Sequence, residues 1–125
     1  MKRLVLEGYF QLIRIEVLML LGSLNRLHEV VRRTAIRRTK RNNLRSADEL
    51  CHAMDLACIF YPKRVMCLQR SVATTLFLRR YGIGAEMVIG AQMLPLKSHA
   101  WVELNGKVIN DKPYMLEIYK PLERC

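Results

Sequence analysis

The spacing of the apolar residues changes at Gly82-Ile83-Gly84, and this change constrains the fold more than any other feature of the sequence. Before this point apolar side chains recur every three to four residues, as in amphipathic helices. After it come short apolar stretches bounded by turn residues, which are typical of β-strands. Helices followed by adjacent antiparallel strands predict an α+β fold.

Four helices are predicted in the first part of the chain, over residues 9–21, about 26–42, 46–60 and 67–81. Gly22 separates the first two, and Ser46-Ala-Asp-Glu49 is a capping box that begins the third. Gly82 is expected to end the fourth helix in the left-handed conformation. Three strands are predicted over residues 85–91, 99–104 and 107–110 or 111.

The hairpin between the last two strands has two possible registers. A two-residue turn at Asn105-Gly106 would place Asp111 on the face of the hairpin opposite to His99. A three-residue loop over residues 104–106 would set the two side chains directly opposite each other. We predict the three-residue loop, because only that register brings His99 and Asp111 together from two ideal strands.

The charge of the chain is concentrated in its first third. The 125 residues suit one domain, and their net charge is +10, with 21 Lys and Arg against 11 Asp and Glu. Residues 1–46 hold eleven basic and three acidic residues, a net +8, whereas residues 47–125 hold ten and eight, a net +2. We therefore predict a basic helical extension over residues 1–45, either part of the same domain or a docking element, and a core over residues 46–125.

Three residues have the chemistry and the expected positions for thiol acyl transfer. Cys67 opens a predicted helix, where free backbone amides and the helix dipole favour a thiolate. His99 opens a predicted strand, and Asp111 closes the strand that follows. A nucleophile, a base and a carboxylate that orients the base are the groups that this chemistry needs. Each residue alone has an ordinary structural interpretation, namely packing, a hydrogen bond or a turn; their order on a helix and two strands favours the catalytic one.

These stretches resemble a known family. The run that starts Cys67-Leu-Gln-Arg-Ser, together with His99-Ala-Trp-Val-Glu103 and Asn110-Asp111, is similar to the transglutaminase-like leader peptidases of lasso-peptide biosynthesis, in particular to their stand-alone form. The resemblance is strong over residues 67–111, weaker over 46–66 and only general before that.

The resemblance implies a papain/transglutaminase-like core in which the helix bearing the cysteine packs on a small antiparallel sheet. It implies Cys67 as nucleophile, His99 as general base and then acid, and Asp111 as the residue that orients the imidazole. The implied reaction is removal of the leader from a ribosomally made precursor, beside a separate leader-recognition protein and a cyclase. Gln69 stands where the family often has proline, and only the Cys67 amide is assigned as an oxyanion donor.

The basic run over residues 32–41 supports a different class of function, a nucleic-acid-binding module without catalysis. No aromatic residue is interleaved with its arginines, and no nucleic-acid reading motif is present. We favour a helix that docks the precursor or its recognition protein through Arg33, Arg37 and Arg38. Trp101 either lines the substrate cleft or lies in the core. A transglutaminase-like acyl transferase is a further alternative, and the amphipathic N-terminus could instead lie on a membrane surface.

No metal or cofactor is expected. Cys51, Asp55 and Cys58 share one face of a predicted helix, near His52, but a fourth ligand is lacking and the two cysteines suit core packing. The Gly82-Ile-Gly84 sequence is too short for a nucleotide-binding loop. The longest uncharged run near the N-terminus is about half of the roughly 20 residues that a spanning helix needs, so we expect a cytoplasmic protein with reduced thiols.

Overall fold

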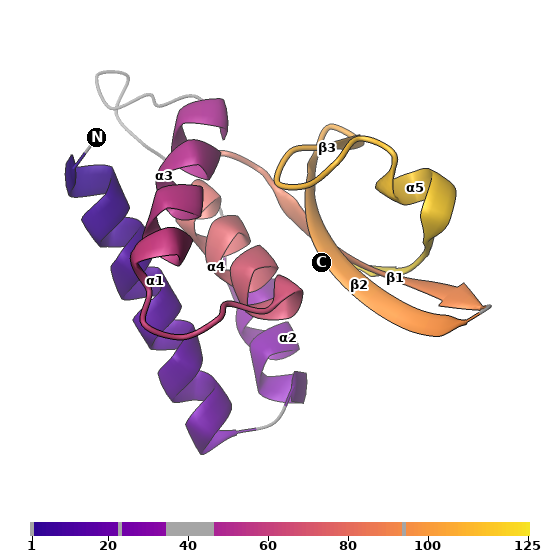
Figure 1. The fold of residues 1–125 in the computed structure, drawn as a ribbon, viewed down its shortest axis with the longest axis horizontal. Helices are drawn as coiled ribbons and strands as arrows, with labels where there is room; N and C mark the ends of the chain where they lie inside the picture. Colours follow the sequence, from indigo (N-terminus) through magenta and orange to yellow (C-terminus); the bar gives the residue numbers. More distant parts are fainter. Residues whose placement is uncertain (1, 23, 35–46, 94) are drawn as a thin grey trace.

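The computed structural model describes residues 2–22, 24–34, 47–93 and 95–125 (Figure 1). It is an α+β fold, as predicted, in which a group of helices lies on one side of a curved antiparallel sheet (Figure 1). The elements follow the chain as α1 (Lys2–Leu21), α2 (Leu24–Arg33), α3 (Ala47–Phe60), α4 (Cys67–Arg80), β1 (Glu86–Met93), β2 (Leu96–Leu104), β3 (Lys107–Val108), α5 (Met115–Ile118) and β4 (Lys120–Arg124).

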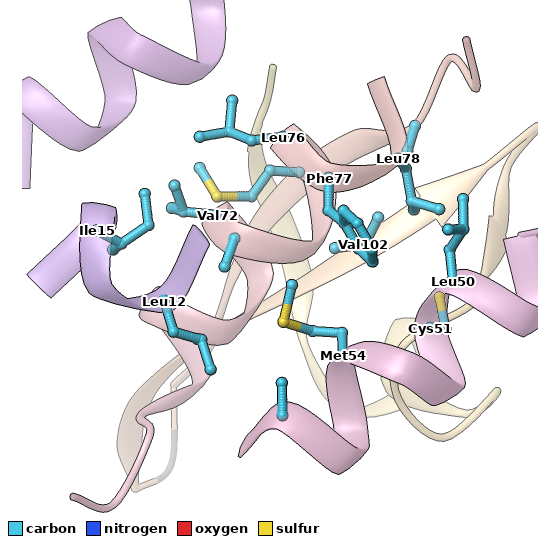
Figure 2. Close-up of a cluster of buried hydrophobic side chains, with 14 of the residues drawn as sticks. Leu12, Ile15, Leu50, Cys51, Met54, Val72, Leu76, Phe77, Leu78 and Val102 are labelled. Atoms are coloured by element: carbon cyan, nitrogen blue, oxygen red, sulfur yellow. The ribbon is translucent and has the colours of Figure 1, made fainter. Parts of the chain in front are cut away.

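The first four helices form what we call the helical body, α1 to α4 with the core between them. α1 packs against α3 and α4, and α2 packs against α1 and α4. Figure 2 shows the centre of this core, where Ile15 of α1, Met54 of α3 and Phe77 of α4 lie among other apolar side chains. All three are fully buried. α1 and α2 therefore bury side chains in the same core as α3 and α4.

The sheet has the strand order β3-β2-β1-β4, with every neighbouring pair antiparallel. Alternation along β2 points Val102 into the core of the helical body. His99, Trp101 and Glu103 therefore share the opposite face of β2, which we call the outer face. On it a second, smaller apolar cluster forms around Trp101, to which the short helix α5 contributes Met115.

The hairpin between β2 and β3 contradicts the predicted register. Leu104 pairs with Lys107, so the connection is the two-residue turn Asn105-Gly106. Both turn residues have positive φ, 53° and 78°, which asparagine and glycine tolerate better than other residues and which matches the twist of a hairpin. The three-residue loop was therefore the wrong choice, because the prediction assumed that the third strand continues as an ideal strand to Asp111.

Several other boundaries differ from the predictions. The first helix begins at Lys2 rather than at residue 9, and the second is helical only to Arg33, with Thr34 outside it. The predicted continuation of that helix and the capping residue Ser46 lie outside the described residues. β2 begins at Leu96, so His99 lies inside the strand and does not open it. The sequence reasoning missed α5 and β4 entirely.

The predicted ends of the third and fourth helices agree with the structure. α3 ends at Phe60 and α4 at Arg80, each within one residue of its predicted end. Gly82 has φ of 83°, the left-handed conformation expected for a residue that stops a helix. Within the described part of the chain, no helix is both long and apolar enough to cross a membrane.

Candidate active site

Cys67 is the first residue of α4, and its side chain is partly exposed. Gln69 fixes this end of the helix, because its Oε1 accepts a hydrogen bond from the Met66 backbone N–H at 3.1 Å. Its amide Nε2 donates to Glu16 of α1 at 3.2 Å. The first backbone N–H groups of a helix have no backbone partner within the helix, so the Cys67 amide can donate to a developing oxyanion. Gln69 thus joins the start of α4 to the helical body.

His99 and Asp111 form the central contact of the site. The His99 Nε2 and the Asp111 Oδ2 lie 2.6 Å apart, and each side chain is about one quarter exposed, 24% and 25%. A ring nitrogen bonded to a carboxylate carries the proton, which leaves Nδ1 of the same ring as an acceptor. The pair therefore presents an oriented imidazole whose free nitrogen can act as a base.

Asp111 reaches His99 because the chain leaves the sheet before Asp111. The β3 ladder ends at Val108, and the Ile109 N–H still binds the carbonyl of Val102 at 3.0 Å. The side chain of the next residue, Asn110, then replaces the ladder, since its Oδ1 accepts from the Val102 N–H at 2.6 Å. Continued pairing would have turned Asp111 away from His99, so the site depends on this departure.

Aromatic rings hold the imidazole on the outer face. The rings of His99 and Tyr119 stack at 5.2 Å between centroids, and those of His99 and Trp101 at 6.2 Å. Gly90 pairs with His99 across the ladder, and a Cβ there would lie 2.5 Å from the Trp101 ring. Trp101 is held in turn by Glu103, whose buried carboxylate accepts from the indole Nε1 at 2.8 Å. The glycine therefore makes room for the ring stack that restricts the His99 side chain.

Cys67 makes no hydrogen bond to His99 or Asp111 within the part of the chain that the structure describes. Asn110 nevertheless links α4 to β2. Its Nδ2 donates to the Ser71 hydroxyl of α4 at 3.4 Å, and its Oδ1 accepts from the Val102 N–H of β2. Cys67 precedes Ser71 by one helical turn on the same face of α4. On β2, His99 lies three residues before Val102, the residue that Asn110 contacts.

The C-terminal ends of α4 and β2 are linked through the start of β1. Near the end of α4, the Arg79 Nε donates to the carbonyl of Ala85 at 3.1 Å. The next residue, Glu86, pairs with Glu103 near the end of β2. The end of α4 therefore lies near the end of β2.

The other cysteines differ from Cys67 in their surroundings. Burial, reinforced by the neighbouring Asp55 and Asp48, raises the pKa of Cys51 to about 11. Burial also raises the pKa values of Cys58 and Cys125 above the ordinary value of a thiol. A raised pKa keeps a thiol protonated at neutral pH and slows its reactions. Cys51 and Cys58 pack in or against the core, as predicted.

The structure describes two of the four predicted binding residues, Arg33 and Trp101. Arg33 is exposed at the end of α2 and pairs with Glu29, and Arg37 and Arg38 lie outside the described residues. Trp101 is fully buried, so of the two positions left open by the sequence it occupies the core. Asp55, considered for a metal site, forms an ion pair with Arg70.

Sequence reasoning missed Asn110, Tyr119 and Gly90 as parts of the site. Asn110 carried only a general signal, since asparagine side chains often bind backbone groups, and nothing in the sequence identifies the Val102 amide as its partner. Tyr119 carried none, because it belongs to the unpredicted segment after Pro113.

The profile of the Transglutaminase-like superfamily matches residues 11–124, which covers α1 from its middle through to β4. The chain belongs to the transglutaminase-like superfamily. It is 47% identical over 49 residues to the Microcin J25-processing protein McjB of Escherichia coli, an alignment that covers 39% of this chain and 24% of that protein. No solved structure matches the chain. The superfamily match and the identity to McjB confirm the predicted family resemblance. The superfamily match also confirms the predicted fold class.

Proposed function

We propose that this transglutaminase-like chain is a cysteine peptidase in which Cys67 is the nucleophile, His99 the general base and acid, and Asp111 the residue that orients the imidazole. The observation that carries the proposal is the 2.6 Å contact between His99 Nε2 and Asp111 Oδ2, which leaves Nδ1 free. A superfamily match over nearly the whole chain supports it independently.

The first half of the reaction forms a thioester. His99 Nδ1 takes the proton of the Cys67 thiol, and the sulfur attacks the carbonyl carbon of the scissile peptide bond. The oxygen of the tetrahedral intermediate gains negative charge, which the Cys67 amide at the start of α4 stabilises. The C–N bond then breaks, and the imidazolium returns its proton to the leaving amine.

The second half hydrolyses the thioester. His99 takes a proton from water, the hydroxide attacks the thioester carbonyl, and the C–S bond breaks with the proton returned to sulfur. The products are one peptide with a new carboxylate and a second peptide with a new free amine. Asp111 holds the imidazole in one tautomer throughout and stabilises the imidazolium that forms twice in the cycle.

The proposed substrate is the junction between leader and core of a lasso-peptide precursor. Identity to a relative named for processing a microcin supports this substrate, although the aligned part is about one quarter of that relative's length. In this proposal a separate recognition protein delivers the leader. A cyclase consumes the free amine of the core, and the reaction takes place in the cytoplasm without a cofactor.

Mass spectrometry of a candidate precursor tests the proposal. The precursor is incubated with this protein, with and without the recognition protein, and we expect two fragments whose summed mass exceeds that of the precursor by one water. Cys67→Ala and His99→Ala should abolish cleavage while far-UV circular dichroism stays unchanged. An amine adduct in place of two fragments would identify an acyl transferase. Intact precursor under both conditions would refute the peptidase assignment for it.

Alkylation tests the activated thiol without any substrate. Because burial raises the pKa values of Cys51, Cys58 and Cys125, we expect iodoacetamide at neutral pH to modify Cys67 first. Peptide mapping identifies the modified residue, and His99→Ala should slow the reaction at Cys67. Equal rates at Cys67 and Cys58, in folded protein, would show that Cys67 is not activated.

A further inference from the structure

The surface of α1 that faces away from the helical body carries a regular apolar stripe. Its large side chains are exposed, from 38% at Ile13 to 78% at Leu20, and follow one another at intervals of four, three, four and three residues. We call Leu6, Phe10, Ile13, Val17 and Leu20 the α1 stripe. Phe10 is 66% exposed and Leu20 is 78% exposed. Alternating intervals of four and three residues are the spacing at which one helix packs against another.

The exposed charged residues of α1 are all positive. Lys2, Arg3 and Arg14 are the exposed ionisable residues of α1. The two acidic residues of the helix are partly buried and already bound within the chain, Glu7 to Arg3 and Tyr81, and Glu16 to Lys63 and Gln69. A partner of this face therefore meets apolar groups and positive charge.

A cationic hollow of about 530 Å³ adjoins the stripe between α1 and α2. Arginines from both helices line it, namely Arg14, Arg26 and Arg33, together with the apolar Leu18 and Val30. Its one acidic residue, Glu29, is already paired with Arg32 and Arg33. Arg14 follows Ile13 of the stripe and also lines the hollow, so the two surfaces adjoin along α1.

We infer that the α1 stripe is the docking surface for an amphipathic acidic helix of another protein. The apolar side of that helix lies along Leu6 to Leu20, and its carboxylates lie near Arg14 and the hollow. A second copy of this chain fits less well, because it would bring the same exposed cations of two proteins of charge +10 together. This surface is separate from His99 and Asp111, so the inference goes beyond the proposed peptidase function and does not depend on it.

Two synthetic helical peptides test the inference. Both carry leucine at the positions spaced four and three residues apart, and they differ only in having glutamate or lysine at the flanking positions, where like charges keep each peptide from pairing with itself. We expect the full-length protein to bind the glutamate peptide at least about tenfold more tightly than the lysine peptide by calorimetry.

Three variants locate the binding on the stripe. Phe10→Ser and Ile13→Ser should each weaken binding of the glutamate peptide about tenfold, and both positions are exposed, so the fold should be retained. Arg14→Glu should reduce the preference for the glutamate peptide. Leu96→Ser is the matched control, since Leu96 is 77% exposed but lies on the distant hairpin of β1 and β2.

Each of the other outcomes would overturn the inference. Equal binding of the two peptides, or binding of neither, would remove the argument from charge. Concentration-dependent dimers of the wild type in light scattering that Phe10→Ser abolishes would make a second copy the occupant. Binding to vesicles of anionic phospholipid that Phe10→Ser abolishes, without binding of the glutamate peptide, would make the occupant a membrane surface.

Discussion

The core of the helical body and the apolar cluster on the outer face of the sheet are both buried, but they contain different chemistry. The core of the helical body is built from aliphatic and sulfur-containing side chains around Phe77, and most of its contacts have no direction (Figure 2). The outer face buries Trp101 beside Glu103, a carboxylate that is only 2% exposed and that binds Arg124 at 2.5 Å. The first region provides stability, and the second fixes the orientation of one imidazole.

This difference predicts that mutations separate into two groups. Changes in the buried core of the helical body should lower the free energy of unfolding and leave the activity of the folded protein intact. Changes on the outer face should alter activity whether or not they alter stability. The following experiments either strengthen or remove that distinction.

The largest effect is expected from Asp111→Asn. The amide keeps the shape of the side chain but no longer stabilises an imidazolium, so precursor cleavage should fall by about 10³- to 10⁴-fold, or about 4–5 kcal/mol in the barrier. Rates are measured on purified protein with the melting temperature as a control, which should change little because Asp111 is one quarter exposed. Unchanged cleavage would exclude Asp111 from the mechanism.

A matched pair of core truncations comes next. Phe77→Ala and Trp101→Ala each remove a fully buried aromatic ring, so each should cost about 3–5 kcal/mol of unfolding free energy in urea titrations. Only Trp101→Ala should also lower cleavage per folded molecule, by about tenfold or more, because His99 loses a stacking partner.

Trp101→Phe provides the milder version of that change if the alanine variant does not fold. It retains a ring against His99, but it removes part of the buried indole and the N–H that binds Glu103. Equal activity losses at Phe77 and Trp101 would show that the two regions are not functionally distinct.

Two glycines should respond in opposite directions to alanine. At Gly90 the new Cβ would lie 2.5 Å from the Trp101 ring, so Gly90→Ala should destabilise the protein by about 1–3 kcal/mol and reduce cleavage. At Gly8, within α1, the new Cβ would meet Ala57 at an ordinary 3.4 Å, so Gly8→Ala should stabilise by about 0.5–1 kcal/mol. Thermal melts of both variants check the two signs, and destabilisation by Gly8→Ala would contradict the packing between α1 and α3.

A small effect is expected at Gln69, where α1 meets the start of α4. Gln69→Ala removes the acceptor for the Met66 N–H and the contact with Glu16, so it should cost about 1 kcal/mol of stability. It should also slow alkylation of Cys67, because the first turn of α4 loses its fixed geometry. Gln69→Glu keeps the acceptor at Met66 but places two carboxylates together, and it should retain the cap only when Glu16→Gln is combined with it.

Much of the architecture could be predicted from local patterns. The change of apolar spacing after Gly84 predicted helices followed by an antiparallel sheet, and Gly82 marked the end of α4, because both signals depend on near neighbours in the chain. α5 and β4 could not be predicted in this way. β4 is short and alternates between exposed and partly exposed residues, so only pairing with β1 identifies it as a strand.

The sequence by itself determined the kinds of residues in the site and their order, Cys67 at a helix start followed by His99 and Asp111. The tertiary structure alone decided how His99 meets Asp111. The turn at Asn105-Gly106 adopts the register that separates two ideal strands, and the contact forms only because Asn110 takes over the hydrogen bond of Val102 and releases the chain from the sheet. That exchange depends on a backbone amide of a different strand, which no pattern within residues 107–111 encodes.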